Sequence, residues 1–178
     1  HSCYEYDLES AHQSILLQLL DNKSIDFLEL KLLRKYVENK KVIRQKLSEE
    51  LQLPLEIAKN ILQALTYGAR LSRSPEEAIY RECDGDKEAI ERVVTHPWLD
   101  QYRKIFEKAH KHLIGDKKSF KNALGIVCEK TGISKQMAHL LQGYERQVID
   151  SLIKRTNKGD IVLLLHDAIV FSGKTSSS

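Results

Sequence analysis

Residues that break helices are scarce in this chain, and this scarcity constrains its fold more than any other feature. Among the 178 residues, 3 are prolines and 8 are glycines. Between these breaks, apolar residues recur at intervals of three and four, as they do on the buried face of a helix. The spacing predicts helices over residues 10–20, 24–33, 54–68, 86–95, 98–113, 117–130 and 134–155. Ser24 and Ser74 are expected to be capping serines, and a further helix would start at Ser74.

Strand signals are confined to the two ends of the chain. Residues 2–8 are aromatic and extended in character, residues 161–165 form a continuous apolar run, and residues 168–171 form another after His166 and Asp167. Two apolar runs separated by two residues are typical of a tight hairpin. We therefore expect an α+β fold that is mostly helical, with a small antiparallel sheet formed from the N-terminal strand and a C-terminal hairpin.

The composition indicates a globular chain without a membrane span. Hydrophobic residues make up 42% of it and charged residues 30%, and its net charge of +3 allows a phosphate-rich partner without requiring one. The apolar run near the C-terminus is far too short to cross a bilayer, and charged residues interrupt the first apolar stretch, so we predict neither a span nor a signal peptide. Three cysteines without a CxxC pair predict reduced thiols, and hence a cytoplasmic or other reducing compartment.

Two aspartates stand where predicted strands end. Asp7 ends the first strand, and Asp167 lies at the turn of the C-terminal hairpin. If these strands pair, the two carboxylates lie together, and their repulsion calls for a divalent cation such as Mg²⁺, which prefers oxygen ligands. Two such ions on shared carboxylates can activate an attacking hydroxyl and stabilise a leaving pyrophosphate. Taken singly, either aspartate is more often a turn or capping residue.

The predicted helix over residues 54–68 carries a second group of candidates. Four polar residues follow one another at helical spacing and are expected near one face: Lys59, Gln63, Thr66 and Tyr67. The Lys59 ammonium can hold a triphosphate, and Tyr67 can stack near a base. The ordinary alternative is a surface lysine and a half-buried aromatic residue near the end of a helix.

Taken together and in order, these segments resemble family A DNA polymerases. Residues 6–12 resemble motif A, residues 59–68 resemble motif B, the nucleotide-binding helix, and residues 165–171 resemble motif C. Residues 141–153, which open with Leu-Gln-Gly, are similar to the Gln-Gly helix that precedes motif C. The resemblance covers the chain almost end to end, and the order of the four segments carries it more than any one of them.

The resemblance implies a template-directed DNA polymerase, a nucleotidyltransferase that acts in DNA replication. Asp7 and Asp167 would bind two Mg²⁺ ions. Lys59 would contact the incoming nucleoside triphosphate and act as the acid toward pyrophosphate. The primer 3′-hydroxyl would attack the α-phosphate between the two ions.

Further residues would bind the nucleotide and the primer–template. Tyr67 would pack against the nascent base pair, with Gln63 and His12 also in the nucleotide site. Gln142 would touch the minor groove of the primer–template, and His166 would lie beside the primer terminus. His12 occupies a position that carries glutamate in family A DNA polymerases and glycine in single-subunit RNA polymerases, so the choice between dNTPs and NTPs stays open.

The resemblance also implies a division of the chain. Residues 1–20 and 116–178 would belong to the palm, and residues 21–115, with the motif B helix over 54–68, to the fingers. The lysine-rich residues 35–46 would form a solvated helix face in the fingers and help to hold template phosphates. The thumb and the earlier palm segment of such an enzyme would lie elsewhere, so we expect a fragment that needs those regions of a parent protein.

Two other interpretations stay open. Residues 128–137 are typical of a helix-turn-helix, which would make the chain a DNA-binding module without catalysis. Ala168, in place of the glutamate expected after the catalytic aspartate, and Leu55, in place of an arginine, suit a degenerate polymerase domain. Trp98 is expected to anchor the core. Four further histidines lack the spacing of a metal site: His96, His110, His112 and His139.

Overall fold

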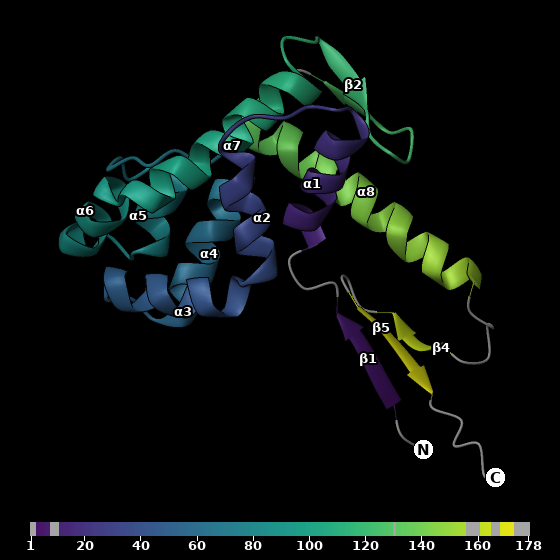
Figure 1. Cartoon of the computed structure of the whole chain (residues 1–178), viewed down its shortest axis with the longest axis horizontal. Coiled ribbons are helices and arrows are strands. Elements are labelled where there is room, and N and C mark those ends of the chain that lie inside the picture. Colours follow the sequence, from purple (N-terminus) through teal and green to yellow (C-terminus); the bar gives the residue numbers. More distant parts are fainter. Residues whose placement is uncertain (1–2, 8–10, 130, 156–160, 165–167, 173–178) are drawn as a thin grey trace.

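The computed structural model describes residues 3–7, 11–129, 131–155, 161–164 and 168–172. Within them the fold is mostly helical with two small antiparallel sheets, as the sequence predicts for the fold class (Figure 1). The helices are α1 (Ala11–Asn22), α2 (Leu30–Glu38), α3 (Lys40–Leu51), α4 (Leu55–Thr66), α5 (Ala78–Glu82), α6 (Lys87–Thr95), α7 (Pro97–Leu113) and α8 (Ile133–Arg155). Among these helices, none combines the length and the hydropathy that a membrane crossing requires.

One hydrophobic core joins the helices from α1 to α8. Helix α7 supplies an aromatic row, because Trp98, Tyr102 and Phe106 follow one another at one-turn intervals. Tyr36 of α2 packs edge-on against Tyr102, with their ring centroids 5.3 Å apart. Residues on both sides of the expected palm–fingers boundaries therefore share this core, which includes Leu16, Leu65, Phe106 and Leu141.

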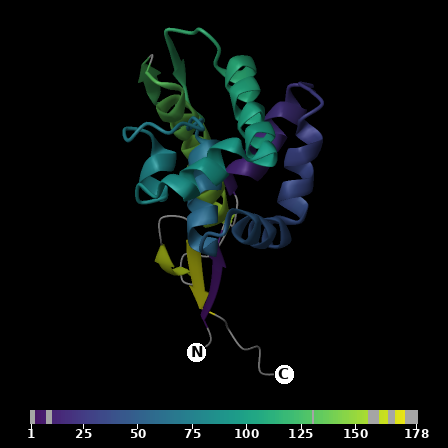
Figure 2. The same ribbon diagram turned by 90° about the vertical axis from the view of Figure 1, so that its left-hand side faces the viewer.

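The two ends of the chain pair in one sheet. Its strands are β1 (Cys3–Asp7), β4 (Ile161–Leu164) and β5 (Ala168–Ser172), in the order β1-β5-β4 with both pairs antiparallel. The N-terminal strand and the C-terminal hairpin are therefore confirmed. In Figures 1 and 2 this sheet lies at one end of the helical body.

The helix expected over residues 117–130 is wrong. The structure has a hairpin there, formed by β2 (Ser119–Lys121) and β3 (Val127–Glu129). Asn122 Oδ1 accepts hydrogen bonds from the backbone N–H groups of Leu124 and Ile126, at 3.0 and 3.1 Å. Such side-chain bonding to the backbone competes with helix formation, and Gly125, at φ +78°, completes the turn.

Both expected serine caps are also wrong. Ser24 has a left-handed backbone, at φ +52°, and its N–H donates to the Asp21 carbonyl, so it belongs to the turn that follows α1. Ser74 accepts a hydrogen bond through its backbone carbonyl from the Glu77 N–H, and α5 begins only at Ala78. In both places the serine lies in a turn that precedes the helix, so the helix starts later in the chain than a capping serine would indicate.

Candidate functional site

Polar side chains from three helices meet at His12, in the first turn of α1. Its Nδ1 lies 2.8 Å from the Tyr67 hydroxyl and 3.2 Å from Gln63 Nε2, both of which come from the end of α4. Its Nε2 lies 3.3 Å from Glu145 Oε2 of α8. His12 and Glu145 are each 8% exposed, so the cluster is largely shielded from water.

The partners of His12 determine its tautomer. An amide N–H can only donate, so the Gln63 contact makes Nδ1 an acceptor, and the Tyr67 hydroxyl can donate to the same atom. The ring proton of the neutral imidazole then lies on Nε2, on the side of the Glu145 carboxylate. Nε2 makes no hydrogen bond in the structure, so its contact with Glu145 is electrostatic.

The environment keeps Tyr67 protonated. Burial raises the pKa of Tyr67, and the negative charge of Glu145 raises it further, while the side chains of Gln63 and Gln142 act in the opposite direction. A protonated hydroxyl can donate to His12, which agrees with the short distance between them. Gln142, an exposed residue of α8, therefore belongs to the edge of this cluster.

A second polar layer lies beneath the first. Thr66 Oγ1 donates to the Leu62 carbonyl at 2.8 Å, accepts from Gln13 Nε2 at 2.9 Å, and lies 3.2 Å from the Tyr102 hydroxyl. Burial raises the pKa of Tyr102, so its hydroxyl stays protonated and can donate to Thr66. Thr66 is completely buried, and its expected place on the exposed nucleotide face is wrong.

Lys59 shares a stripe of α4 with Gln63 and Tyr67 but points to the surface. Its Nζ lies 3.1 Å from Glu56 Oε2, and its side chain is 40% exposed. An exposed pair of this kind stabilises a protein by about 0.2–1 kcal/mol. The ammonium is therefore held weakly and can turn to another anion.

The position of Asp7 is given by the backbone pairing of its strand. It pairs with Ala168, the first residue of β5, at the end of β1. Asp167 and His166 lie outside the described residues. Within the described part of the chain, no group of three or more His, Cys, Asp or Glu side chains forms a metal site.

Comparison with protein-family models, with curated proteins and with solved structures found no match.

Two glycines near this cluster, Gly68 and Gly143, have packing roles. A Cβ added to Gly68, where φ is +86°, would lie 2.6 Å from Ile133 Cγ2, at the start of α8. A Cβ on Gly143 would lie 2.7 Å from Asn122 Cβ. Gly68 thus lets the end of α4 approach α8, and Gly143 lets the β2–β3 hairpin dock on α8. These approaches bring Tyr67 and Gln142 into one cluster.

The segment before α8 is not the first helix of a helix-turn-helix. Residues 127–129 form a strand of the β2–β3 hairpin, so the DNA-binding motif expected over residues 128–137 is wrong. The hairpin is also held to α8 by His139, whose Nε2 lies 3.2 Å from the Ile126 carbonyl oxygen. That contact gives His139 a structural role.

Gln13 and Glu145 also belong to these polar layers, and neither was predicted from the sequence. Glu145 follows Gln142 by one helical turn, and that spacing could have indicated that both face α1 and α4. Gln13 had no such signal, because a glutamine in the first turn of a helix is usually exposed.

Proposed function

We propose that this chain is the core of a template-directed nucleotidyltransferase similar to family A DNA polymerases. The contact between His12 and Tyr67 carries the proposal. It joins residues from the segments that resemble motif A and motif B, and Gln63 binds the same imidazole nitrogen. Three residues expected in one nucleotide site from sequence alone thus form one hydrogen-bonded group.

The terminal sheet supports the metal-binding part of the proposal. Asp7 pairs with Ala168, the residue that follows Asp167 in the sequence, so the end of β1 lies beside the start of β5, next to the segment that would supply the second carboxylate. Asp7 and Asp167 would hold two Mg²⁺ ions through their oxygen atoms. Such ions, when bound, supply the positive charge that activates a primer hydroxyl and stabilises pyrophosphate.

The residues of α4 would bind the incoming nucleoside triphosphate. Lys59 would exchange its exposed pair with Glu56 for the triphosphate and then act as the acid toward pyrophosphate. Tyr67 would present its ring to the nascent base pair while its hydroxyl stays on His12. His12 is held in orientation by Tyr67 and Gln63, so it would present a fixed surface to the sugar.

The primer–template would lie along α8 and the hairpin of β4 and β5. Gln142 is exposed beside Tyr67, where its amide can reach a minor groove. His166 would stand at the primer terminus. Cys83 and Cys128 carry free thiols, which suits a reducing compartment such as the cytoplasm.

Primer extension by the full-length protein tests this proposal. We expect Asp7→Asn and Asp167→Asn to abolish extension, because each removes a charge that holds the ions, and to leave nucleic-acid binding intact. Lys59→Met should lower the rate by about 10²–10⁴-fold, the range for loss of a general acid. Lys111→Met, an exposed lysine near the end of α7, is the control.

Extension by Asp7→Asn at the wild-type rate would refute the assignment. Binding of primer–template by wild type without extension, with dNTPs or with NTPs, would instead identify a degenerate polymerase domain. The position of Ala168 opposite Asp7 makes that second outcome worth testing.

A further inference from the structure

A cavity of about 560 Å³ lies away from the cluster around His12. It is formed by α2, α3 and the start of α7, and its volume falls within the range of ligand sites, roughly 300–1,000 Å³. Most of the lining is apolar, from Leu32, Ile43, Leu47, Pro97 and Trp98. We call it the Trp98 cavity.

Trp98 gives the cavity an aromatic wall held in place from behind. Its indole stacks on the Tyr102 ring, with centroids 5.0 Å apart and planes 16° from parallel. Tyr102 is itself fully buried. A ring backed in this way is a rigid platform, and base–aromatic stacking on such a platform contributes about 1–3 kcal/mol per base.

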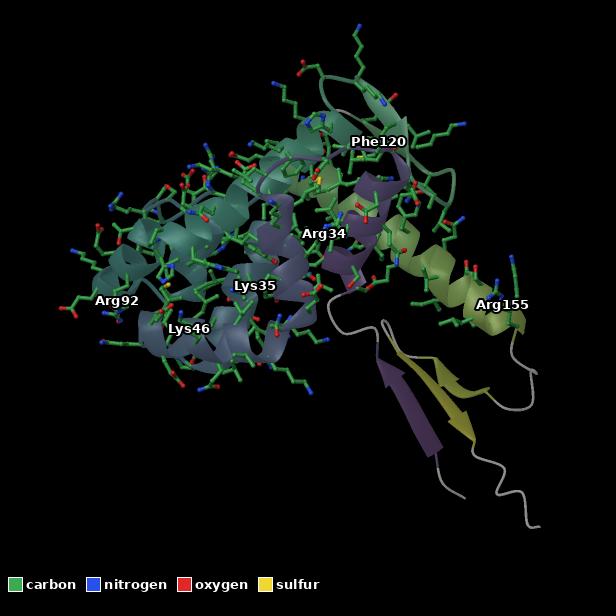
Figure 3. All side chains as sticks on the ribbon, viewed as in Figure 1. Arg34, Lys35, Lys46, Arg92, Phe120 and Arg155 are labelled. Carbon is green, nitrogen blue, oxygen red and sulfur yellow. The ribbon has the colours of Figure 1, made fainter. Side chains whose placement is uncertain are left out.

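Two lysines from different helices line the same cavity. They are Lys35 of α2 and Lys46 of α3, both labelled in Figure 3. The Lys35 ammonium has no acidic partner among the residues that the structure describes. Lys46 Nζ lies 3.6 Å from Oε1 of Glu50, which also lines the cavity. The two side chains are 70% and 43% exposed, so this pair is weak. Both cations are available to an anionic ligand.

The positive charge around the cavity covers a longer stretch of surface than one small ligand would contact. Residues 31–46 contain seven Lys or Arg side chains and one acidic side chain, Glu38, although the whole chain has a net charge of only +3. At the mouth of the cavity Val42 is 70% exposed, an unusual position for a large apolar side chain within a charged segment. Aromatic, apolar and cationic groups together are the combination that single-stranded nucleic acids bind.

We propose that the Trp98 cavity binds an unpaired nucleotide of a single-stranded nucleic acid. The base lies against Trp98 between the apolar walls, and the flanking phosphates lie beside Lys35 and Lys46. A strand is favoured over a free nucleotide because the basic segment continues past the cavity to Lys40 and Lys41. Binding here needs neither Asp7 nor catalysis, and only the identification of the strand as template rests on the proposed function.

Trp98 is the single tryptophan of the chain, so its fluorescence reports on the cavity directly. We would titrate the full-length protein, with any other tryptophan replaced by phenylalanine, with an oligo(dT) of about 12 nucleotides, within the usual range of single-strand sites. We expect saturable quenching that weakens as salt increases. Free dTMP, duplex DNA and poly-glutamate are the comparison ligands, and each should bind more weakly than the strand.

The lysines are tested with the double variant Lys35→Gln/Lys46→Gln. Each lost phosphate contact should lower the slope of log affinity against log salt by about 0.7, so the double variant should lose about 1.4. Over one decade of salt below 1 M that slope amounts to about 25-fold weaker binding at 0.1 M. Lys111→Gln/Lys117→Gln makes the same change in net charge at exposed sites outside the cavity and should leave the affinity within twofold of wild type.

Val42→Glu and Val42→Lys form a matched pair at the mouth. Both remove the same exposed apolar side chain, so neither disturbs the core, and binding should fall with the glutamate and persist with the lysine. Absence of quenching by oligo(dT), or equal quenching by poly-glutamate, would overturn the proposal. Equal affinity for dTMP would overturn the choice of a strand.

This experiment separates the two proposals. Asp7→Asn should quench like wild type even if it extends no primer. If oligo(dT) quenches the Trp98 fluorescence of the wild-type protein but that protein extends no primer, the catalytic proposal is refuted and strand binding in the Trp98 cavity still stands. If the Lys35→Gln/Lys46→Gln variant extends primers and binds the strand with unchanged affinity, strand binding in the Trp98 cavity is refuted and the catalytic proposal still stands.

Discussion

Replacement of Thr66 by valine tests the buried layer on which the candidate site rests. Valine has nearly the same shape but lacks the hydroxyl, so two buried donors, Gln13 Nε2 and the Tyr102 hydroxyl, lose their acceptor. A buried group left without a partner costs about 1–3 kcal/mol. Gln13 Nε2 also lies 3.4 Å from the Tyr102 hydroxyl, a long contact that can compensate in part. We therefore expect Thr66→Val to lower the free energy of unfolding by about 2–4 kcal/mol.

Urea denaturation at neutral pH measures this change. With a slope of about 2 kcal/mol per M of urea, the middle of the usual range, the midpoint should fall by roughly 1–2 M. Thr66→Ser is the matched control, because it keeps the hydroxyl and removes one buried methyl group, at a cost of about 1 kcal/mol. If valine and serine lower the midpoint equally, the hydroxyl contributes nothing and the argument from the buried layer fails.

Two further predictions concern Gly68 and Tyr67. Gly68→Ala should destabilise the protein by about 1–3 kcal/mol, because alanine is strained at φ +86° and its Cβ would lie 2.6 Å from Ile133 Cγ2. Urea denaturation measures this loss, and a change below about 0.5 kcal/mol would contradict the close approach of Gly68 to Ile133. The pKa of Tyr67 is raised in the folded state, so its contribution to stability is complete below the unfolded pKa of about 10 and is lost as pH rises through the folded value. Tyr67→Phe should therefore flatten the loss of stability above about pH 10, and an unchanged alkaline profile would rule out this contribution.

Long-range pairing of the chain ends was predictable because the strand signals there had no competitor. The apolar runs over residues 161–165 and 168–171 are short, adjacent and unlike the helical pattern elsewhere. Strands β4 (Ile161–Leu164) and β5 (Ala168–Ser172) lie there. The β2–β3 hairpin was missed because its residues carry no alternation strong enough to exclude a helix. Its decisive feature, the Asn122 side chain bonded to two backbone N–H groups, depends on geometry that spacing alone does not reveal.

Part of the candidate site was predictable for a similar reason. Gln63 and Tyr67 are one turn apart on α4, so periodicity alone places them together. Thr66 was misplaced because it also follows Gln63 at helical spacing, yet successive helical residues are separated by about 100°, so Thr66 and Tyr67 point in different directions. Only the packing of α4 against α1 and α7 decides which of the two is buried.

The two polar layers are joined through neighbouring residues, and this arrangement explains how a histidine can be positioned at the end of a short helix. Gln13 and Thr66 hydrogen-bond inside the core, and the residues next to them in sequence, His12 and Tyr67, hydrogen-bond in the candidate site. The helix turn between neighbours is fixed, so anchoring one member of each pair orients the other. A group that binds a substrate is most effective when its supporting residues are rigid. The buried layer therefore gives His12 a defined direction, and loss of the Thr66 hydroxyl should disturb the His12–Tyr67 contact without changing either residue.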